Sequence, residues 1–178
     1  MKILKKILMG FGILLLVLVL VSFFLPSKVH VERSKEFAAK PEEVFPYFNN
    51  YHNWNKWNPW FELDPNMKLT YSGPEEGTGA YYKWESEKRE AGSGSMLITV
   101  SKPNELVINE LDFKGQGKAM SRATFEPTAS GGTKLTWSLD SDMGMNPIGK
   151  YVGVFFMDKM IGESYEKGFS NLETLVEK

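Results

Sequence analysis

Short stretches in which apolar and polar residues alternate constrain the fold of this chain more than any other feature. Such alternation is typical of β-strands that bury one face. It begins with VHVERSKEF (29–37) and returns in six later stretches, which Gly, Pro, Asn and Ser residues separate. The later stretches cover residues 67–72, 80–86, 95–101, 105–113, 119–127 and 133–141. Because most connections have the length of a hairpin loop, we expect these seven strands to form an antiparallel sheet.

After the last of these stretches the apolar period lengthens. From Ile148 to Val176 the apolar residues fall on one face of a helix, which predicts one long amphipathic helix with a disturbance near Gly162. Two shorter elements follow the first strand: a helix that begins at Pro41, and a second short helix or irregular turn at residues 51–60. This order predicts an α+β fold, in which a curved antiparallel sheet wraps around the last helix. Such a sheet often encloses a cavity at one end.

Residues 7–25 form an uncharged apolar run of 19 residues. About 20 apolar residues cross a bilayer core as a helix. A cleaved signal peptide is the alternative, but its apolar region is usually shorter and ends at small residues, whereas this run ends in SFFLP. We therefore expect residues 1–28 to be a transmembrane anchor with a juxtamembrane segment, and residues 29–178 to be one domain. Three lysines before the run favour a cytoplasmic N-terminus, so the domain is expected on the extracytoplasmic side of the cell membrane.

The charge of the domain argues against nucleic acid as a partner. The first 28 residues hold four of the chain's 21 Lys and Arg residues and none of its 22 Asp and Glu residues, so residues 29–178 carry a net charge of about −5. A nucleic-acid-binding domain of this size typically carries an excess of basic residues. The chain also contains no cysteine, which excludes disulfides, thiolate metal ligands and cysteine nucleophiles.

The segment YHNWNKWNPW (51–60) places three of the five tryptophans at every third position. On a helix this spacing puts the side chains on one slowly drifting face, so that one side of the segment can bury all three. We expect Trp57 and Trp60 to close the open end of the sheet by core packing. For Trp54, core packing and a place in a cavity wall remain equally open.

Several stretches resemble those of the SRPBCC superfamily, which includes START, polyketide cyclase and birch-pollen-allergen proteins. The nearest branch is that of the bacterial polyketide cyclase/dehydrase and lipid transport proteins. The resemblance covers about residues 30–178 and implies the helix-grip fold, with a cavity for lipids, sterols, polyketides or hormones; only some members catalyse a reaction. The stretches that carry it are FAAKPEEVFPYFNN, WNKWNPW, GPEEGTGAYYKWES, GGTKLTWSLD and MDKMIGESYEKGFSNLETLVEK.

A helix-grip fold turns alternate side chains of the later strands toward the C-terminal helix. The resemblance and this alternation together predict a cavity whose wall is apolar with a few polar groups, as in small-molecule sites generally. Tyr151 and Leu172 of the helix are expected to face the sheet as well. The expected cavity residues are Trp54, Tyr82, Trp84, Ser121, Trp137, Phe155, Tyr165 and Phe169.

The sequence assigns no catalytic residue, metal or cofactor. Its two histidines are distant in sequence, and a metal site needs three or four converging ligands. Glu110 and Asp140 are modest candidates for an acid or base, although Glu110 and Arg122 are expected to pair across strands on the outer face. The glycines of GSGS (92–95) are expected to form a turn, and no phosphate-binding or nucleophile motif occurs.

Three functions remain after these exclusions. The favoured one is a membrane-tethered module that binds or carries a hydrophobic small molecule (a lipid, isoprenoid or polyketide-like compound) between the sheet and the C-terminal helix. Its partners are that small molecule and, through residues 7–25, the membrane. The first alternative is a cyclase or dehydratase-type enzyme that acts on a hydrophobic substrate. The second is a domain without a cavity that binds a protein partner through an exposed tryptophan segment.

Overall fold

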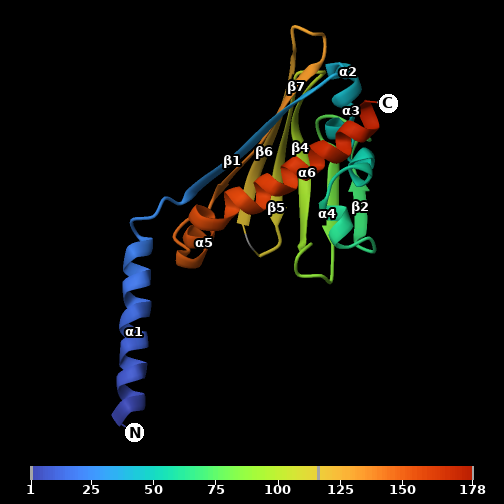
Figure 1. Cartoon of the computed structure of the whole chain (residues 1–178). Helices are drawn as coiled ribbons and strands as arrows, with labels where there is room; N and C mark the ends of the chain where they lie inside the picture. Colours follow the sequence, from blue (N-terminus) through green and yellow to red (C-terminus); the bar gives the residue numbers. More distant parts are fainter. Residues whose placement is uncertain (1, 116, 178) are drawn as a thin grey trace.

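Seven strands form one antiparallel sheet in the computed structural model, which describes residues 2–115 and 117–177 (Figure 1). Their order is β1-β7-β6-β5-β4-β3-β2, and neighbouring strands pair antiparallel. The strands are β1 (Lys28–Phe37), β2 (Lys68–Ser72), β3 (Tyr81–Glu85), β4 (Ser93–Lys102), β5 (Leu106–Phe113), β6 (Gly117–Pro127) and β7 (Thr133–Asp142). The predicted sheet is confirmed, and each strand begins and ends within two residues of its predicted bounds.

Helical elements lie before the sheet, in its first crossover and at its end. Between β1 and β2 the chain makes several short turns of helix, and after β7 it makes one long, interrupted helix (Figure 1). The elements are α1 (Lys2–Ser22), α2 (Pro41–Val44), α3 (Pro46–Asn49), the 3₁₀ helix η1 (Tyr51–Lys56), α4 (Trp60–Leu63), α5 (Pro147–Val152), the π-helical η2 (Gly153–Met157) and α6 (Asp158–Val176).

The inner face of the sheet packs against α6, which crosses it diagonally (Figure 1). The alternation of the strands produces this arrangement, because every second side chain of β5, β6 and β7 is buried while most of those between them are exposed. Helix α6 packs against this face through five buried residues that share one side of the helix: Gly162, Tyr165, Gly168, Phe169 and Leu172. This is the predicted helix-grip fold.

The interruption of the last helix lies at Gly153–Met157 and not near Gly162, so the predicted position was wrong. Gly162 sits within regular α6, where its missing side chain serves packing: an added Cβ would collide with the Arg33 guanidinium of β1. Gly153 plays a similar part in η2, because its Cβ would lie 2.6 Å from a methyl group of Val29. Both glycines therefore let the helix approach the edge strand β1 closely.

Arg33 fastens α6 to β1. Its Nη1 lies 2.9 Å from Oδ1 of Asp158, and its Nε lies 3.1 Å from Oε1 of Glu166. Asp158 and Glu166 are four residues before and after Gly162, so the guanidinium lies across the glycine with one carboxylate on each side. The side chain of Arg33 is three-quarters buried. A guanidinium suits this place because it donates in a planar fork to two acceptors at once.

Helix α1 stands apart from the sheet (Figure 1). Residues 3–22 have a mean hydropathy of 2.5, and all of them except Ser22 are exposed. This is the one helix of the described chain that is long and apolar enough to cross a membrane. A signal sequence near the N-terminus can meet the same criterion of length and hydropathy. Five residues, 23–27, join α1 to β1.

The C-terminal end of α1 is attached to α5. Lys150 Nζ donates a hydrogen bond of 3.1 Å to the carbonyl of Ser22, and the Tyr151 hydroxyl donates one of 2.9 Å to the carbonyl of Leu18. Tyr151 thus points to α1 and not to the sheet, contrary to the expectation from helical periodicity. The π-helical η2 explains the difference. Its one extra residue rotates the side chains of α5 about the helix axis relative to the buried face of α6.

The ion pairs of Arg33 with Asp158 and Glu166, here called the Arg33 clamp, predict that the stability of the fold is sensitive to acid. Hydrogen bonding to Arg33 lowers the pKa of Asp158, so this pair stabilises the fold fully above the ordinary aspartate pKa of about 4 and progressively less below it. We expect the Tm of the wild-type chain to fall more steeply below that pH than the Tm of Arg33→Met, measured by near-ultraviolet circular dichroism. Lys159→Met is the control, since Lys159 only reaches Glu163 at 4.0 Å on the surface. Equal slopes for Arg33→Met and wild type would show that the clamp does not contribute.

Candidate ligand cavity

A cavity of about 340 Å³ lies between the inner face of the sheet and the first turns of α6. This volume falls in the range of small-molecule sites, about 300–1,000 Å³. Aromatic and aliphatic side chains make most of its wall, and the β3–β4 loop forms part of its rim. The lining residues are Trp54, Asn58, Trp60, Phe61, Met67, Tyr82, Trp84, Arg89, Glu90, Ala91, Gly92, Ser93, Met96, Leu111, Phe113, Ser121, Trp137, Leu139, Met160, Ile161 and Tyr165.

One wall of the cavity is the stacked pair of Trp137 from β7 and Tyr165 from α6. Their ring centroids are 3.8 Å apart and their planes differ by 10°. Trp137 Nε1 donates a 2.8 Å hydrogen bond to the hydroxyl of Ser121 on the neighbouring strand β6. Stacking on Tyr165 restrains the face of the Trp137 ring, and the hydrogen bond to Ser121 restrains its Nε1 edge. This wall is therefore rigid before any ligand binds.

A second wall is formed by Tyr82 and Trp84 on β3, which lie two residues apart on one face of the strand. Their rings stack with centroids 5.6 Å apart and an angle of 16°. The indole of Trp84 lies over Gly94 of β4, where an added Cβ would be 2.7 Å from the ring and 2.5 Å from the carbonyl oxygen of Asp112. Gly94 is thus a strand residue that admits a tryptophan, and the predicted turn at residues 92–95 was wrong from Ser93 onward.

The tryptophan segment divides its three indoles between packing and the cavity. Trp57 is 1% exposed, packs on Phe48 with centroids 4.7 Å apart, and donates to the carbonyl of Tyr47, as expected of a core residue. Trp54 is 4% exposed and lines the cavity. Trp60 also lines the cavity and meets both Trp137 and Tyr165 edge-on, so it does more than close the sheet.

The polar groups inside the cavity are neutral. Burial raises the pKa of the Tyr82 phenol and of the Tyr165 phenol, which therefore stay protonated and able to donate hydrogen bonds near neutral pH. The Ser121 hydroxyl and the Asn58 amide add further polar atoms. The charged side chains that line the cavity, Arg89 and Glu90, belong to residues of the exposed loop at its rim. A ligand would thus meet apolar walls with a few neutral donors inside and charges only at the edge.

Of the eight residues expected to line the cavity, the structure brings six together: Trp54, Tyr82, Trp84, Ser121, Trp137 and Tyr165. Phe155 does not line it, because the side chain lies in η2 and is 63% exposed. Phe169 is buried one turn further along α6, where it packs edge-on against Phe37 with centroids 6.2 Å apart. The phase shift at η2 explains Phe155, since an uninterrupted helix would turn it toward the sheet.

The sequence reasoning missed much of the remaining wall. Met96, Leu111 and Leu139 could have been found, since each alternates with buried neighbours on its own strand. The loop residues at the rim and the flanking Phe61 and Met67 carry no periodic signal. They reach the cavity only because the chain folds back over the end of the sheet.

The acidic candidates lie outside the cavity. Glu110 and Asp140 are exposed and line a separate depression on the outer face of the sheet. Asp140 accepts from His30 Nδ1 at 2.7 Å, if that nitrogen carries the proton. Glu110 stands opposite Met120 and Arg122 opposite Ile108, and among the described residues they form no ion pair with each other. Within residues 2–115 and 117–177, no group of three His, Cys, Asp or Glu side chains is placed to hold a metal ion.

Residues 28–177 match the family model described as polyketide cyclase / dehydrase and lipid transport. No curated protein was found to match the chain.

Three solved structures illustrate the likeness in fold. A protein of unknown function from Staphylococcus aureus is 16% identical with a TM-score of 0.62, and the match covers 85% of this chain and 97% of that one. Truncated norcoclaurine synthase from Thalictrum flavum is 13% identical with a TM-score of 0.62, covering 84% and 93%. Ara h 8.0201 is 16% identical with a TM-score of 0.58, covering 84% and 97%. At such low identities these likenesses concern the fold alone.

The close approach of Trp84 to Gly94 yields a test of the cavity wall. We expect Gly94→Ala to displace the indole or separate β4 from β5, and to lower the free energy of unfolding by about 1–3 kcal/mol, the usual effect of overpacking. The measurement is denaturant unfolding followed by tryptophan fluorescence. Ser95→Ala is the matched control at the next, outward-facing position and should change stability by less than about 0.5 kcal/mol. Equal effects of both variants would contradict the described packing.

Proposed function

Because the chain belongs to the polyketide cyclase/dehydrase and lipid transport family, we propose that it is a membrane-tethered module that binds or carries a hydrophobic small molecule. The ligand would lie between the sheet and α6, in the cavity lined by Trp54, Tyr82 and Trp137. The observation that carries the proposal is the cavity itself: it persists beside a densely packed aromatic core, and its wall is rigid and mainly apolar.

The wall suggests the chemistry of the ligand. Flat indole and phenol rings on two sides suit an elongated or planar apolar body, such as an isoprenoid, a polyketide-like ring system or an acyl chain. The hydroxyls of Ser121, Tyr82 and Tyr165 suit one or two uncharged polar groups on that body. An anionic group would be accommodated only at the rim, near Arg89. A charged group deep inside would lack a counterion and would bind poorly.

Tethering supports the same function. Residues 1–28 would hold the domain, residues 29–178, at a bilayer in which apolar ligands are dissolved. The lysines that precede the apolar run 7–25 favour a domain outside the cytoplasm, and this proposal adopts that orientation.

The other two functions receive less support. A cyclase or dehydratase needs an acid or base at the cavity, and the two carboxylates considered for this role face outward. An enzyme would therefore have to rely on the phenols of Tyr82 and Tyr165 or on the rim. A protein-binding patch of tryptophans needs exposed indoles, whereas Trp54 and Trp57 are buried.

Native mass spectrometry of the full chain, extracted from its host membrane, tests the proposal. We expect a compound of defined mass that stays bound until the chain unfolds. In Leu111→Trp an indole enters the cavity, and we expect at least about a tenfold loss of bound compound, because such filling removes more than about 1.4 kcal/mol of binding. Met120→Trp is the control, since it adds the same indole on the outer face.

The two variants separate a cavity ligand from lipid that adheres to α1. If Leu111→Trp retains as much compound as Met120→Trp, the compound is not in the cavity and the binding proposal is wrong. The mass of the chain itself reports whether residues 1–25 remain attached. A recovered chain that lacks them would refute the tether while leaving the cavity ligand in place.

A further inference from the structure

Residues 145–160 expose an unusual number of large apolar side chains for a surface segment. Seven of them are at least 37% exposed, although they flank a helix that otherwise buries its apolar face. A soluble monomer rarely exposes a contiguous apolar patch of more than a few hundred Å² without a partner for it. The seven are Met145, Ile148, Val152, Val154, Phe155, Phe156 and Met160.

The backbone of this segment fixes the direction of these side chains. Gly153 fits against Val29 of β1 with no room for a Cβ, so this side of η2 must face the sheet. Val154, Phe155 and Phe156 follow at once and are all exposed. The segment carries three charged side chains. Lys150 is 9% exposed and hydrogen-bonded to α1, Asp158 just after η2 is paired with Arg33, and Lys159 is the one with a strongly exposed charge and only a 4.0 Å contact to Glu163.

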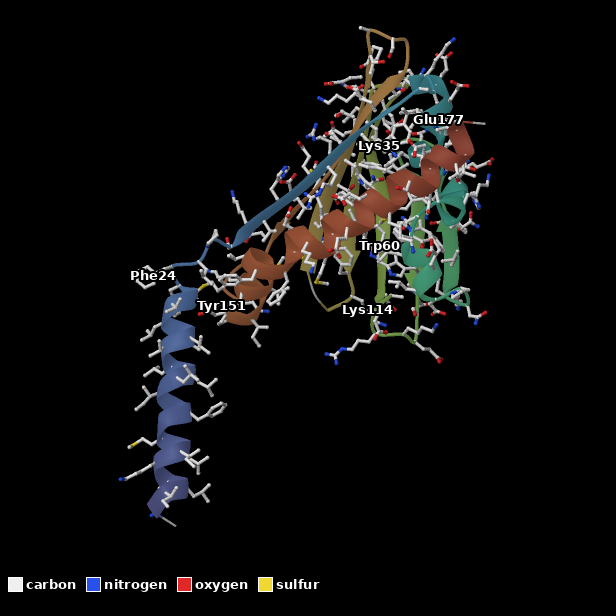
Figure 2. The ribbon with its side chains drawn as sticks, viewed as in Figure 1. Phe24, Lys35, Trp60, Lys114, Tyr151 and Glu177 are labelled. Atoms are coloured by element: carbon white, nitrogen blue, oxygen red, sulfur yellow. The ribbon has the colours of Figure 1, made fainter. Side chains whose placement is uncertain are left out.

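The segment adjoins the end of α1. Tyr151 and Phe24 lie at the same end of that helix, where it meets the domain (Figure 2). The hydrogen bonds to the carbonyls of Leu18 and Ser22 fix the position of the segment along α1. Leu18 lies about 6 Å from Ser22 toward the N-terminus, since the helix rises 1.5 Å per residue, so Tyr151 reaches that far along α1. Phe23 and Phe24, both strongly exposed, extend the apolar surface between α1 and the segment. A tyrosine such as Tyr151 beside the end of a membrane-spanning helix is typical of a bilayer interface.

We propose that the 145–160 segment lies in the bilayer interface beside α1 and directs the mouth of the cavity toward the membrane. This proposal rests on the tether proposed above. The link to the cavity is Met160, which is 58% exposed and also lines the cavity next to Ile161. The apolar surface therefore continues from the bilayer side into the cavity without a polar break at this side chain.

The loop side of the cavity rim, opposite Met160, also lies at the end of the domain that faces α1. Lys114, in the β5–β6 turn, lies at the end of the sheet that faces α1, and the neighbouring β3–β4 loop carries the rim residue Arg89 (Figures 1 and 2). Cationic side chains at that level would meet lipid headgroups. The mouth would thus have an apolar side formed by the segment and a charged side formed by the loops, where Arg89 stands next to Glu90.

Site-specific fluorescence in nanodiscs tests this placement. The chain has no cysteine, so Ile148→Cys and Phe155→Cys each create one site for an environment-sensitive NBD label on the full chain. Ser130→Cys is the control, in the exposed β6–β7 turn at the opposite end of the sheet (Figure 1). The nanodiscs contain phosphatidylcholine and phosphatidylglycerol, with or without a doxyl-labelled lipid as quencher.

We expect quenching by doxyl lipid at positions 148 and 155 to exceed that at position 130 by about threefold or more, because interfacial segments bury their apolar face about 5–10 Å into the bilayer. Equal quenching at all three positions would overturn the proposal. Labels that are shielded from water but not quenched by lipid, with shielding that rises with the number of chains per disc, would also overturn it and show that a second copy covers the patch. Labelling two separate positions guards against one substitution that fails to fold.

The outcome is independent of ligand binding. Strong lipid quenching in a chain whose bound compound survives Leu111→Trp would support the membrane placement and refute the cavity ligand. Weak quenching in a chain that loses its compound on Leu111→Trp would do the reverse.

Discussion

The stack of Trp137 on Tyr165 is the interaction on which the rest of this structure depends. It joins the inner face of the sheet to α6 across a distance of 3.8 Å, and the rings of Phe48, Trp54, Trp57, Trp60 and Phe169 are grouped around Trp137. Such aromatic pairs contribute about 0.5–1.5 kcal/mol beyond the area that they bury. Because large rings leave irregular gaps where they end, the same cluster that holds the helix also borders the cavity.

A second set of contacts, at glycines of α6, determines how closely this helix can approach the sheet. Gly162 receives the Arg33 guanidinium, and Gly168 lies where a Cβ would be only 3.3 Å from the ring of Trp57. Small residues on α6 thus face large ones on the sheet and just after η1, and this pairing gives interdigitated packing without added volume. The grip is tight along most of α6 and loosens toward its first turns, where Met160 and Ile161 border empty space.

The sequence predicted the sheet well because a period of two residues directly reports which face of a strand is buried. All seven strands followed from it, their antiparallel pairing followed from the hairpin-length loops, and the long last helix followed from the change to a helical period. Three features escaped because they depend on residues distant in sequence. Gly94 looks like a turn residue until Trp84 is seen to lie over it, and Gly162 looks like a helix breaker until Arg33 is seen to occupy its surface. The π-helical turn has no local signal, and without it Phe155 is assigned to the cavity.

The five-residue connection between α1 and β1 has a consequence for transport. Five extended residues reach no farther than about 17 Å. In the tethered arrangement proposed above, the domain therefore stays next to its own membrane, searches a two-dimensional surface, and experiences local partners at an effective concentration of the order of millimolar. Such a module cannot shuttle its cargo across a wide aqueous space. In the carrier function proposed above, it would pass its cargo only to an acceptor that comes to the membrane, as the first member of a relay.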